Sequence, residues 1–230
     1  MGDIVYPSND FNFDNITLAN PNGLQGGCYF TKLLNNNNPL YIQTTSCKTK
    51  NGIVNTSKKS YCDLQFNNND NVIVSWFENL EKTIQKIIYD KKDLWFHNEI
   101  DMEDIENAFT SPIRMYKGGK FYLVRSNISK NNLENYENLK CYNEEGLPLQ
   151  LTDIDDNSNI VPLLQVAGVK FSSKNFVIEL MLRQVMILNN CDIFDKCLIK
   201  NSRKSSNKIN LDDNNLKLDY LEETNLEETN

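Results

Sequence analysis

Residues 161–188 read VPLLQVAGVKF-SSKN-FVIELMLRQVMIL, two apolar runs on either side of a short polar connection. Val, Ile, Leu and Phe dominate both runs, a composition typical of buried strands. Glu179, Arg183 and Gln184 interrupt the second run, and neither run reaches the roughly 20 apolar residues of a membrane-spanning helix. The stretch therefore predicts two long strands, residues 161–171 and 176–188, joined by a hairpin loop at 172–175.

Shorter segments upstream also have strand character. Residues 27–34 and 40–47 alternate and are rich in Tyr, Phe, Ile and Thr, with a turn at 35–39 between them. The other predicted strands are 61–66, which follows a loop containing Asn51-Gly52, and 113–116 and 120–128, which flank the turn Lys117-Gly118-Gly119.

Between these groups of strands the apolar period changes. From Val72 to His97, apolar residues recur at helical spacing and Glu and Lys fill the other face, which predicts a long amphipathic helix. Residues 101–109 predict a short helix that stops before Pro112. Three strands, a helix and further closing strands are the order of an OB-fold. The predicted fold is mainly β with one long α-helix, an OB-fold-like barrel with the helix between strands three and four.

The 230 residues suffice for one sizeable domain. We expect an N-terminal arm over residues 1–14, the OB-fold-like domain over 15–200, and a basic linker with an acidic tail over 201–230. Low hydrophobicity and like charge predict a disordered tail. Residues 1–13 show no export signal, which predicts an intracellular, non-secreted protein whose six cysteines are reduced. A Cys47–Cys62 bridge is the alternative for that pair.

Charge is segregated along the chain, although the net charge is −7. Residues 211–230 hold seven acidic residues against Lys217, so they carry most of the negative charge. Residues 15–62 and 107–133 contain no Asp or Glu and hold five basic residues each. Separated signs of this kind favour a basic binding face, whereas an ordinary solvated surface is the alternative for either segment alone.

Aromatic residues are interleaved with cations in these basic segments. Single-stranded nucleic acid is bound by this combination, because cations contact phosphates and aromatic rings stack on bases. Strand alternation sends some of these rings into the core, so core packing is the alternative for any one of them. We expect phosphate contacts from Lys48, Lys50, Lys58, Lys59, Lys117, Lys120, Arg125, Lys170 and Lys174, and base stacking on Tyr41, Tyr61, Tyr116 and Tyr122.

Catalytic and metal-binding patterns are weak. His97 has no second histidine with which to share a metal, and no nucleophile-elbow, phosphate-loop or zinc-protease motif occurs. Acidic groups at residues 101–106 and 153–156 are the candidates for metal-dependent nuclease chemistry, and solvated surface is the simpler interpretation of both. The sequence therefore predicts no enzymatic activity, no metal and no cofactor.

Several segments together resemble a known family. They are residues 166–188 (VAGVKFSSKNFVIELMLRQVMIL), 22–30 (NGLQGGCYF), 108–114 (AFTSPIR) and 116–125 (YKGGKFYLVR), with the helix around Trp76-Phe77. Over about residues 15–190 the chain resembles bacteriophage T-seven-type single-stranded DNA-binding proteins, and more closely their homologues in nucleocytoplasmic large DNA viruses. The resemblance consists of strand patterns and spacing rather than a catalytic signature.

The resemblance implies an OB-fold that covers single-stranded DNA in viral replication and recombination. It also implies homodimers, a location in the host nucleus or a cytoplasmic viral factory, and a tail that recruits DNA polymerase and helicase. The tail residues concerned are Asp212, Asp213, Asp219, Tyr220, Glu222, Glu223, Glu227 and Glu228. We expect the tail to compete with DNA for the lysines of the body. The alternative is a non-enzymatic interaction protein of the virion or its assembly machinery, in which the lysines are solvated surface.

Overall fold

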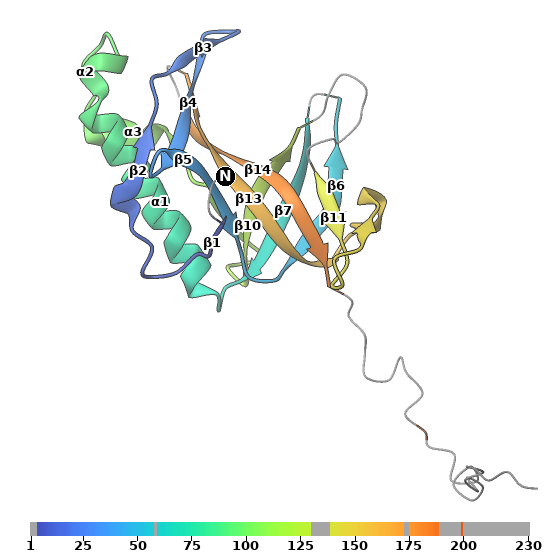
Figure 1. The fold of residues 1–230 in the computed structure, drawn as a ribbon. Helices are drawn as coiled ribbons and strands as arrows, with labels where there is room; N and C mark the ends of the chain where they lie inside the picture. Colours follow the sequence, from blue (N-terminus) through green and yellow to red (C-terminus); the bar gives the residue numbers. More distant parts are fainter. Residues whose placement is uncertain (1–3, 58, 130–138, 173–174, 189–198, 200–230) are drawn as a thin grey trace, which may run out of the picture. The chain divides into compact units, whose positions relative to one another are not determined.

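The computed structural model describes residues 4–57, 59–129, 139–172, 175–188 and 199. In this part of the chain the strands form one 14-stranded sheet, accompanied by α-helices and short 3-10 helices (Figure 1). Internal contacts divide the chain into residues 1–190 and 191–230, and the described elements lie in the first unit. No described helix is both long and apolar enough to cross a membrane. The fold is mainly β, as the sequence predicts.

The elements follow one another in two groups of strands around the helices. The strands before the helices are β1 (Ile4–Val5), β2 (Ile16–Leu18), β3 (Asn22–Leu24), β4 (Cys28–Asn35), β5 (Asn38–Gln43), β6 (Cys47–Asn55) and β7 (Ser60–Asn67). The helices are α1 (Asn71–Asp90), α2 (Lys92–Trp95) and α3 (Met102–Ala108), with the 3-10 helices η1 (Phe13–Asn15) and η2 (Leu151–Asp153). The later strands are β8 (Phe109–Thr110), β9 (Ile113–Tyr116), β10 (Phe121–Ile128), β11 (Lys140–Tyr142), β12 (Pro148–Leu149), β13 (Asn159–Phe171) and β14 (Phe176–Ile187).

Five of these strands pair in a closed cycle. β6 pairs with β7, β7 with β10, β10 with β14, β14 with β13, and β13 returns to β6. The β10–β14 pair is parallel and the other four pairs are antiparallel. Inward side chains such as Leu64, Val124, Ile160 and Leu182 are at most 1% exposed. The cycle is therefore a barrel filled by side chains.

The helix occupies a different place in the strand order from the one predicted. It lies between β7 and β10, the second and third strands of the cycle, rather than between the third and fourth. The predicted first hairpin, β4 and β5, stands outside the cycle and pairs with β13. Strand β6 takes the place of this hairpin in the cycle. Two barrel strands therefore precede the helix, instead of the predicted three.

The loop predicted around Asn51-Gly52 is wrong, because these residues belong to strand β6. The register between β6 and β7 shifts between Thr49 and Ile53, and Gly52 has a φ of 57° within the shift. A Cβ on Gly52 would lie 2.5 Å from the carbonyl oxygen of Ile154. The extra residues of this bulge break the alternation by which a strand is recognised, although the pairing with β7 continues on both sides.

Helix α1 packs its apolar face on the sheet and ends earlier than predicted. Ile73, Trp76, Phe77, Leu80 and Ile84 are at most 2% exposed and join the core. The helix stops at Asp90, where Lys91 leaves helical geometry (φ −104°, ψ 6°), and the predicted continuation is the separate short helix α2.

The N-terminal residues expected to form an arm contact the body. β1 pairs in parallel with β5, and the rings of Phe11 and Phe13 lie 5.4 and 5.6 Å from that of Trp76. The predicted turn after β4 is confirmed: Asn36 and Asn37 form a two-residue loop, both with positive φ (48° and 61°), as a type I′ hairpin turn requires.

Candidate nucleic-acid interface

Side chains that point away from the barrel core on β7 and β10 form one surface, which we call the outer face. On β7, Cys62 and Leu64 are fully buried in the core, so the alternating residues Tyr61 and Asp63 point the other way. In the antiparallel register, Arg125 of β10 lies opposite Asp63 and Asn127 lies opposite Tyr61. Residues 62 positions apart in the sequence therefore become neighbours on the outer face.

Strands β9 and β6 extend the outer face on either side. Arg114 pairs with Leu123 and Tyr116 with Phe121, which places both β9 side chains on the face of Arg125. Lys48 of β6 lies opposite Gln65 of β7. The outer face thus runs across four adjacent strands in the order β6, β7, β10 and β9.

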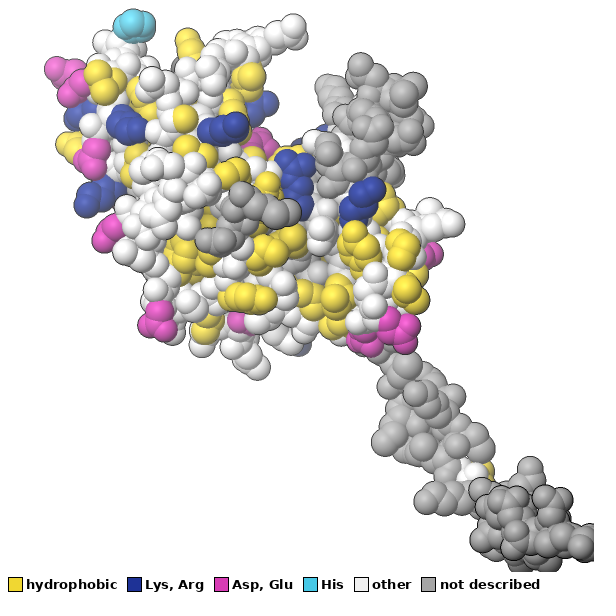
Figure 2. Space-filling view, in the orientation of Figure 1, with side chains coloured by type: hydrophobic (Ala, Val, Ile, Leu, Met, Phe, Trp, Pro, Cys, Tyr) yellow, Lys and Arg dark blue, Asp and Glu magenta, His cyan; other side chains and the backbone are white. Residues whose placement is uncertain are grey.

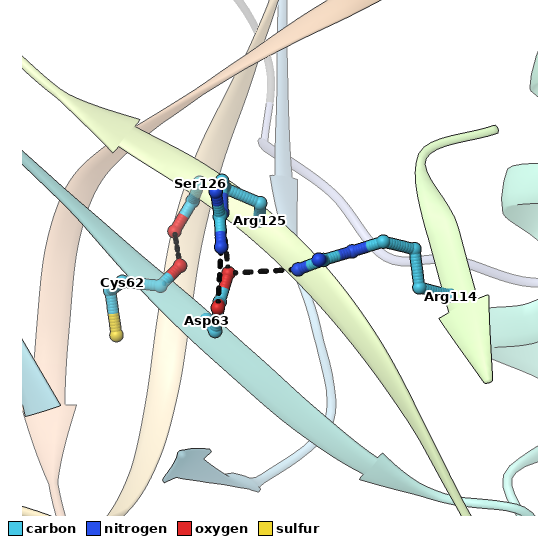
Figure 3. A network of polar contacts seen from close by, with 5 residues as sticks. All are labelled: Cys62, Asp63, Arg114, Arg125 and Ser126. Carbon is cyan, nitrogen blue, oxygen red and sulfur yellow. Dashed lines mark hydrogen bonds and ion pairs between the residues drawn. The ribbon is translucent and has the colours of Figure 1, made fainter. Parts of the chain in front are cut away.

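The centre of the outer face is a carboxylate held between two guanidinium groups (Figure 3). Arg125 donates from Nε to Asp63 Oδ1 at 2.8 Å and from a terminal nitrogen to Oδ2 at 2.9 Å. Arg114 donates to Oδ1 at 3.2 Å. The Asp63 side chain is 7% exposed, against 33% for Arg125 and 49% for Arg114. Asp63 therefore lies beneath the two arginines.

The charge of Asp63 is stabilised at this position. Burial alone would raise its pKa, but the hydrogen bond and charge of Arg125, with the charges of Arg114 and Lys50, outweigh that effect and lower the pKa below its usual value. In return, the hydrogen bonds that Arg125 donates to Asp63 raise the pKa of Arg125. The three groups form a stable ionised unit.

Two tyrosines on the outer face have cations over their rings. The guanidinium carbon of Arg125 lies 3.9 Å and Lys59 Nζ 5.7 Å from the centroid of the Tyr61 ring. Lys50 Nζ lies 4.6 Å and Lys117 Nζ 5.4 Å from the centroid of Tyr116. Both tyrosines are half-buried. These are the distances of cation–π contacts, which keep the ammonium groups on the aromatic part of the surface.

On the neighbouring part of the surface, over β13 and β14, several polar side chains are hydrogen-bonded to one another. Asn127 Nδ2 donates to Glu179 at 2.7 Å, and Arg183 donates twice to Gln165 Oε1, at 2.9 and 2.6 Å. In the space-filling view, Lys and Arg side chains lie in the upper half of the molecule and apolar side chains cover the middle (Figure 2). On the face that this view shows, positive charge is therefore concentrated in one half.

The structure brings together six of the predicted binding residues. They are Lys50, Lys59, Tyr61, Tyr116, Lys117 and Arg125. Lys48 lies beside them, opposite Gln65. Lys120 is exposed in the turn before β10, and Lys170 is exposed on β13 opposite Val177. Tyr41 lies on β5, which β13 and β6 separate from β7.

Two predicted residues have other roles in the structure. Tyr122 pairs with Phe66 on the core side of β10 and lies with Phe77 of α1, so it does not belong to the outer face. Alternation explains this, because its neighbours Phe121 and Leu123 point outward. Arg125 lies on the outer face with two of its N–H groups donated to Asp63, and its contact with a phosphate stays a prediction.

The other predicted binding residues lie outside the described part of the chain. These are Lys58, Lys174 and the tail residues Asp212, Asp213, Asp219, Tyr220, Glu222, Glu223, Glu227 and Glu228.

Four of the acidic residues considered for nuclease chemistry have local structural partners. Asp101 and Asp104 form a reciprocal capping box at the start of α3. Asp153 accepts from the backbone of Gln150, and Asp155 pairs with Ser158. No group of three or more metal-ligating side chains occurs among the described residues. Cys47 and Cys62 are both buried free thiols, so the alternative disulfide is absent from this structure.

Comparison with known proteins finds similarity only at the level of structure. No protein-family model matches the chain, and no curated protein matches it. The single-stranded DNA-binding protein gp2.5 of bacteriophage T7 aligns over 70% of this chain and 98% of its own, with 12% identity and a TM-score of 0.42. The single-stranded DNA-binding protein of bacteriophage Enc34 aligns over 80% and 96%, with 8% identity and a TM-score of 0.42. The structure of the Enc34 protein with single-stranded DNA aligns over 73% and 89%, with 7% identity and a TM-score of 0.41.

The sequence did not identify Asp63 and Arg114 as members of the site. Asp63 is an acidic residue in a strand of alternating polarity, which is the ordinary pattern of a solvated position. One signal in the sequence could have identified it. Asp63 is two positions after Tyr61, a predicted stacking residue, and residues two positions apart in a strand share a face. Arg114 stood in the basic segment, but its contact with Asp63 depends on the β7–β10–β9 pairing.

Proposed function

We propose that the chain binds single-stranded DNA on the outer face, across β6, β7, β10 and β9. One observation carries the proposal: Lys50, Lys59 and Lys117 converge on the rings of Tyr61 and Tyr116. None of these lysines forms an ion pair with a described carboxylate. Ammonium groups beside aromatic rings suit single strands, because the cations contact phosphates while each ring stacks a base for about 1–3 kcal/mol.

The strand order supports the same assignment. In chain order the five barrel strands are β6, β7, β10, β13 and β14. Around the barrel their order is β6, β7, β10, β14 and β13, so the fifth strand lies between the third and the fourth. The third and fifth strands, β10 and β14, are parallel. This is the order of an OB-fold, in which the face of strands two and three binds oligonucleotides. Here those strands are β7 and β10, which carry Tyr61 and Arg125.

On binding, the lysines would exchange their contacts with the tyrosine rings for contacts with phosphates. A lysine ammonium is a point charge on a flexible stem, so Lys59 and Lys117 can leave the rings and contact phosphates. The exposed face of each ring then receives a base. Stacking on a ring accepts any base, so this part of the site tolerates all sequences.

The acidic residues at 211–230 would compete with DNA for the same lysines, because they carry the charge sign of phosphate. We extend the proposal to viral DNA replication and recombination, with homodimers and recruitment of a DNA polymerase or helicase through the tail. This extension rests on the sequence resemblance. Strand annealing, polymerase pull-down and sedimentation assays with and without the tail test its three parts.

The decisive experiment is fluorescence anisotropy with a labelled oligo-dT of about 30 nucleotides, long enough for several aromatic contacts. The full chain and a version ending at Ser202 are titrated across a range of salt, with duplex DNA of equal length as control. We expect preference for the single strand, steep weakening with salt, and tighter binding without the tail.

Paired variants locate the site. Replacing Lys59 and Lys117 by Ala should weaken binding and reduce the salt slope by about 1.4, because each lost single-strand phosphate contact contributes about 0.7. Replacing Lys82 and Lys86, exposed on α1, removes the same charge elsewhere and should have little effect. Absence of binding by both chain lengths at low salt would overturn the proposal and leave a protein-interaction module as the better account.

A further inference from the structure

A polar pocket of about 540 Å³ lies at one end of the outer face. Four carboxamide side chains line it: Gln65 and Asn67 from β7, Asn159 from the start of β13, and Asn157 just before it. The other lining residues include Phe121, Lys48 and Lys117. Its volume is within the range of small-ligand sites, about 300–1,000 Å³.

The pocket adjoins the part of the outer face where lysines lie over the ring of Tyr116. Phe121 pairs with Asn67 on one side and with Tyr116 on the other. Lys117 Nζ lies 5.4 Å from the centroid of Tyr116 and 5.9 Å from that of Phe121, so one lysine serves both places. A strand bound over Tyr116 would therefore reach the pocket.

The lining groups match the parts of a nucleotide. A carboxamide both donates and accepts hydrogen bonds, as the edge of a nucleobase does. The Phe121 ring supplies a stacking surface, and Lys48 and Lys117 supply charges for the flanking phosphates. An apolar ligand would displace water from the carboxamides of Gln65, Asn67 and Asn157 without replacing its hydrogen bonds, which is costly.

Asp70 makes the pocket selective for bases that donate a hydrogen bond. It precedes α1 and lines the pocket, and its Oδ2 accepts a hydrogen bond from Thr45 Oγ1 at 2.6 Å. A carboxylate only accepts hydrogen bonds. It suits the amino group of cytosine, whereas uracil and thymine present a carbonyl oxygen at the same position.

We propose that this pocket binds one unstacked nucleobase of the bound strand and favours bases that carry an exocyclic amino group, cytosine among them. The inference rests on the proposed single-stranded DNA binding and adds a base-selective position to a site that is otherwise sequence-tolerant.

The test compares oligo-dC with oligo-dU of equal length. The two bases have nearly the same shape and differ at position 4, where an amino group stands against a carbonyl oxygen, and at N3, where an acceptor stands against an N–H donor. We expect the wild-type chain to bind oligo-dC about fivefold more tightly, the lower end of one specific base contact. In Asp70→Asn the two affinities should come within about twofold, because a carboxamide can donate to the uracil oxygen as well as accept.

The matched control is Asp90→Asn, at the other end of the same helix. It makes the same change in net charge and should keep the wild-type ratio of the two affinities. Asn is a favourable residue before a helix, so Asp70→Asn should fold, and its thermal unfolding checks this.

The outcomes separate the two proposals. Binding of both homopolymers with equal affinity, or a preference that Asp70→Asn leaves intact, overturns the base-selective pocket while single-stranded DNA binding stands. Failure to bind either homopolymer at low salt overturns both. A preference for oligo-dC that disappears in Asp70→Asn and persists in Asp90→Asn supports the pocket.

Discussion

The guanidinium carbon of Arg125 lies 3.9 Å from the centroid of the Tyr61 ring. The same guanidinium donates two hydrogen bonds to Asp63, whose side chain is 7% exposed. Asp63 therefore holds Arg125 in place over the ring. On the proposed DNA binding, this buried carboxylate would limit both the charge available to a phosphate and the access of a base to Tyr61.

Removing that carboxylate should strengthen DNA binding. In Asp63→Asn the guanidinium groups of Arg125 and Arg114 lose their charged partner and become available for phosphates. We expect higher affinity for single-stranded DNA and a salt slope steeper by up to about 1.4, from two added phosphate contacts. Anisotropy across a salt titration measures both quantities.

The control for this variant is Asp93→Asn, on the exposed side of α2, which makes the same change in net charge. Equal slopes for the two variants would show that only the overall charge matters and would contradict a local effect at Asp63.

The same ion pair should make stability depend on pH. At neutral pH, Asp63→Asn should lower the free energy of unfolding by about 1.5–3 kcal/mol, the range for hydrogen bonds to charged groups. The pKa of Asp63 in the folded state is lower than its usual value, so the folded protein binds fewer protons than the unfolded chain. The stabilisation is therefore complete above about pH 5 and is lost as the pH falls below about 4.

Urea unfolding of the wild type and Asp63→Asn at a series of pH values measures this difference. The gap between the two should narrow in acid. A gap that stayed constant or widened below pH 4 would mean that Asp63 does not stabilise the fold as a carboxylate.

Local signals in the sequence predicted those parts of the fold that short segments determine. Asn36 and Asn37 accept positive φ and give the β4–β5 turn, and the Lys117-Gly118-Gly119 turn joins β9 to β10 as expected. The β13–β14 hairpin follows from two mainly apolar runs joined by a short polar connection. In each case the interacting strands are neighbours in the chain, so composition and turn residues suffice.

Long-range pairing could not be predicted in the same way. Closure of the barrel depends on contacts such as Thr49 Oγ1 with the carbonyl oxygen of Asp155, 106 residues away. The bulge at Gly52 hid β6, and with it the place of α1 in the strand order. In β10, Phe121, Tyr122, Leu123 and Val124 are all apolar, so the sequence does not show which of them face outward.

Tyr61 lies on the outer face and Tyr122 on the core side, so replacing each of them tests base stacking. Tyr61→Leu should weaken single-stranded DNA binding by about 1–3 kcal/mol and leave the salt slope nearly unchanged, because a ring is lost and no phosphate contact is removed. Tyr122→Leu makes the same chemical change on the core side, beside Phe77. It should lower stability and leave DNA affinity intact. Equal loss of affinity in both variants would contradict the assignment of the outer face.

The buried thiols should resist alkylation in the native protein. Burial, with the nearby charge of Asp63, raises the pKa of Cys62 to about 12, and burial with the charges of Cys62 and Asp70 raises the pKa of Cys47 well above its usual value. The thiolate is the nucleophile, so neither residue should react with iodoacetamide near pH 8, whereas half-exposed Cys28 should. Peptide mass spectrometry before and after unfolding in urea measures this for each cysteine. Rapid native labelling of Cys62 would contradict its burial in the core.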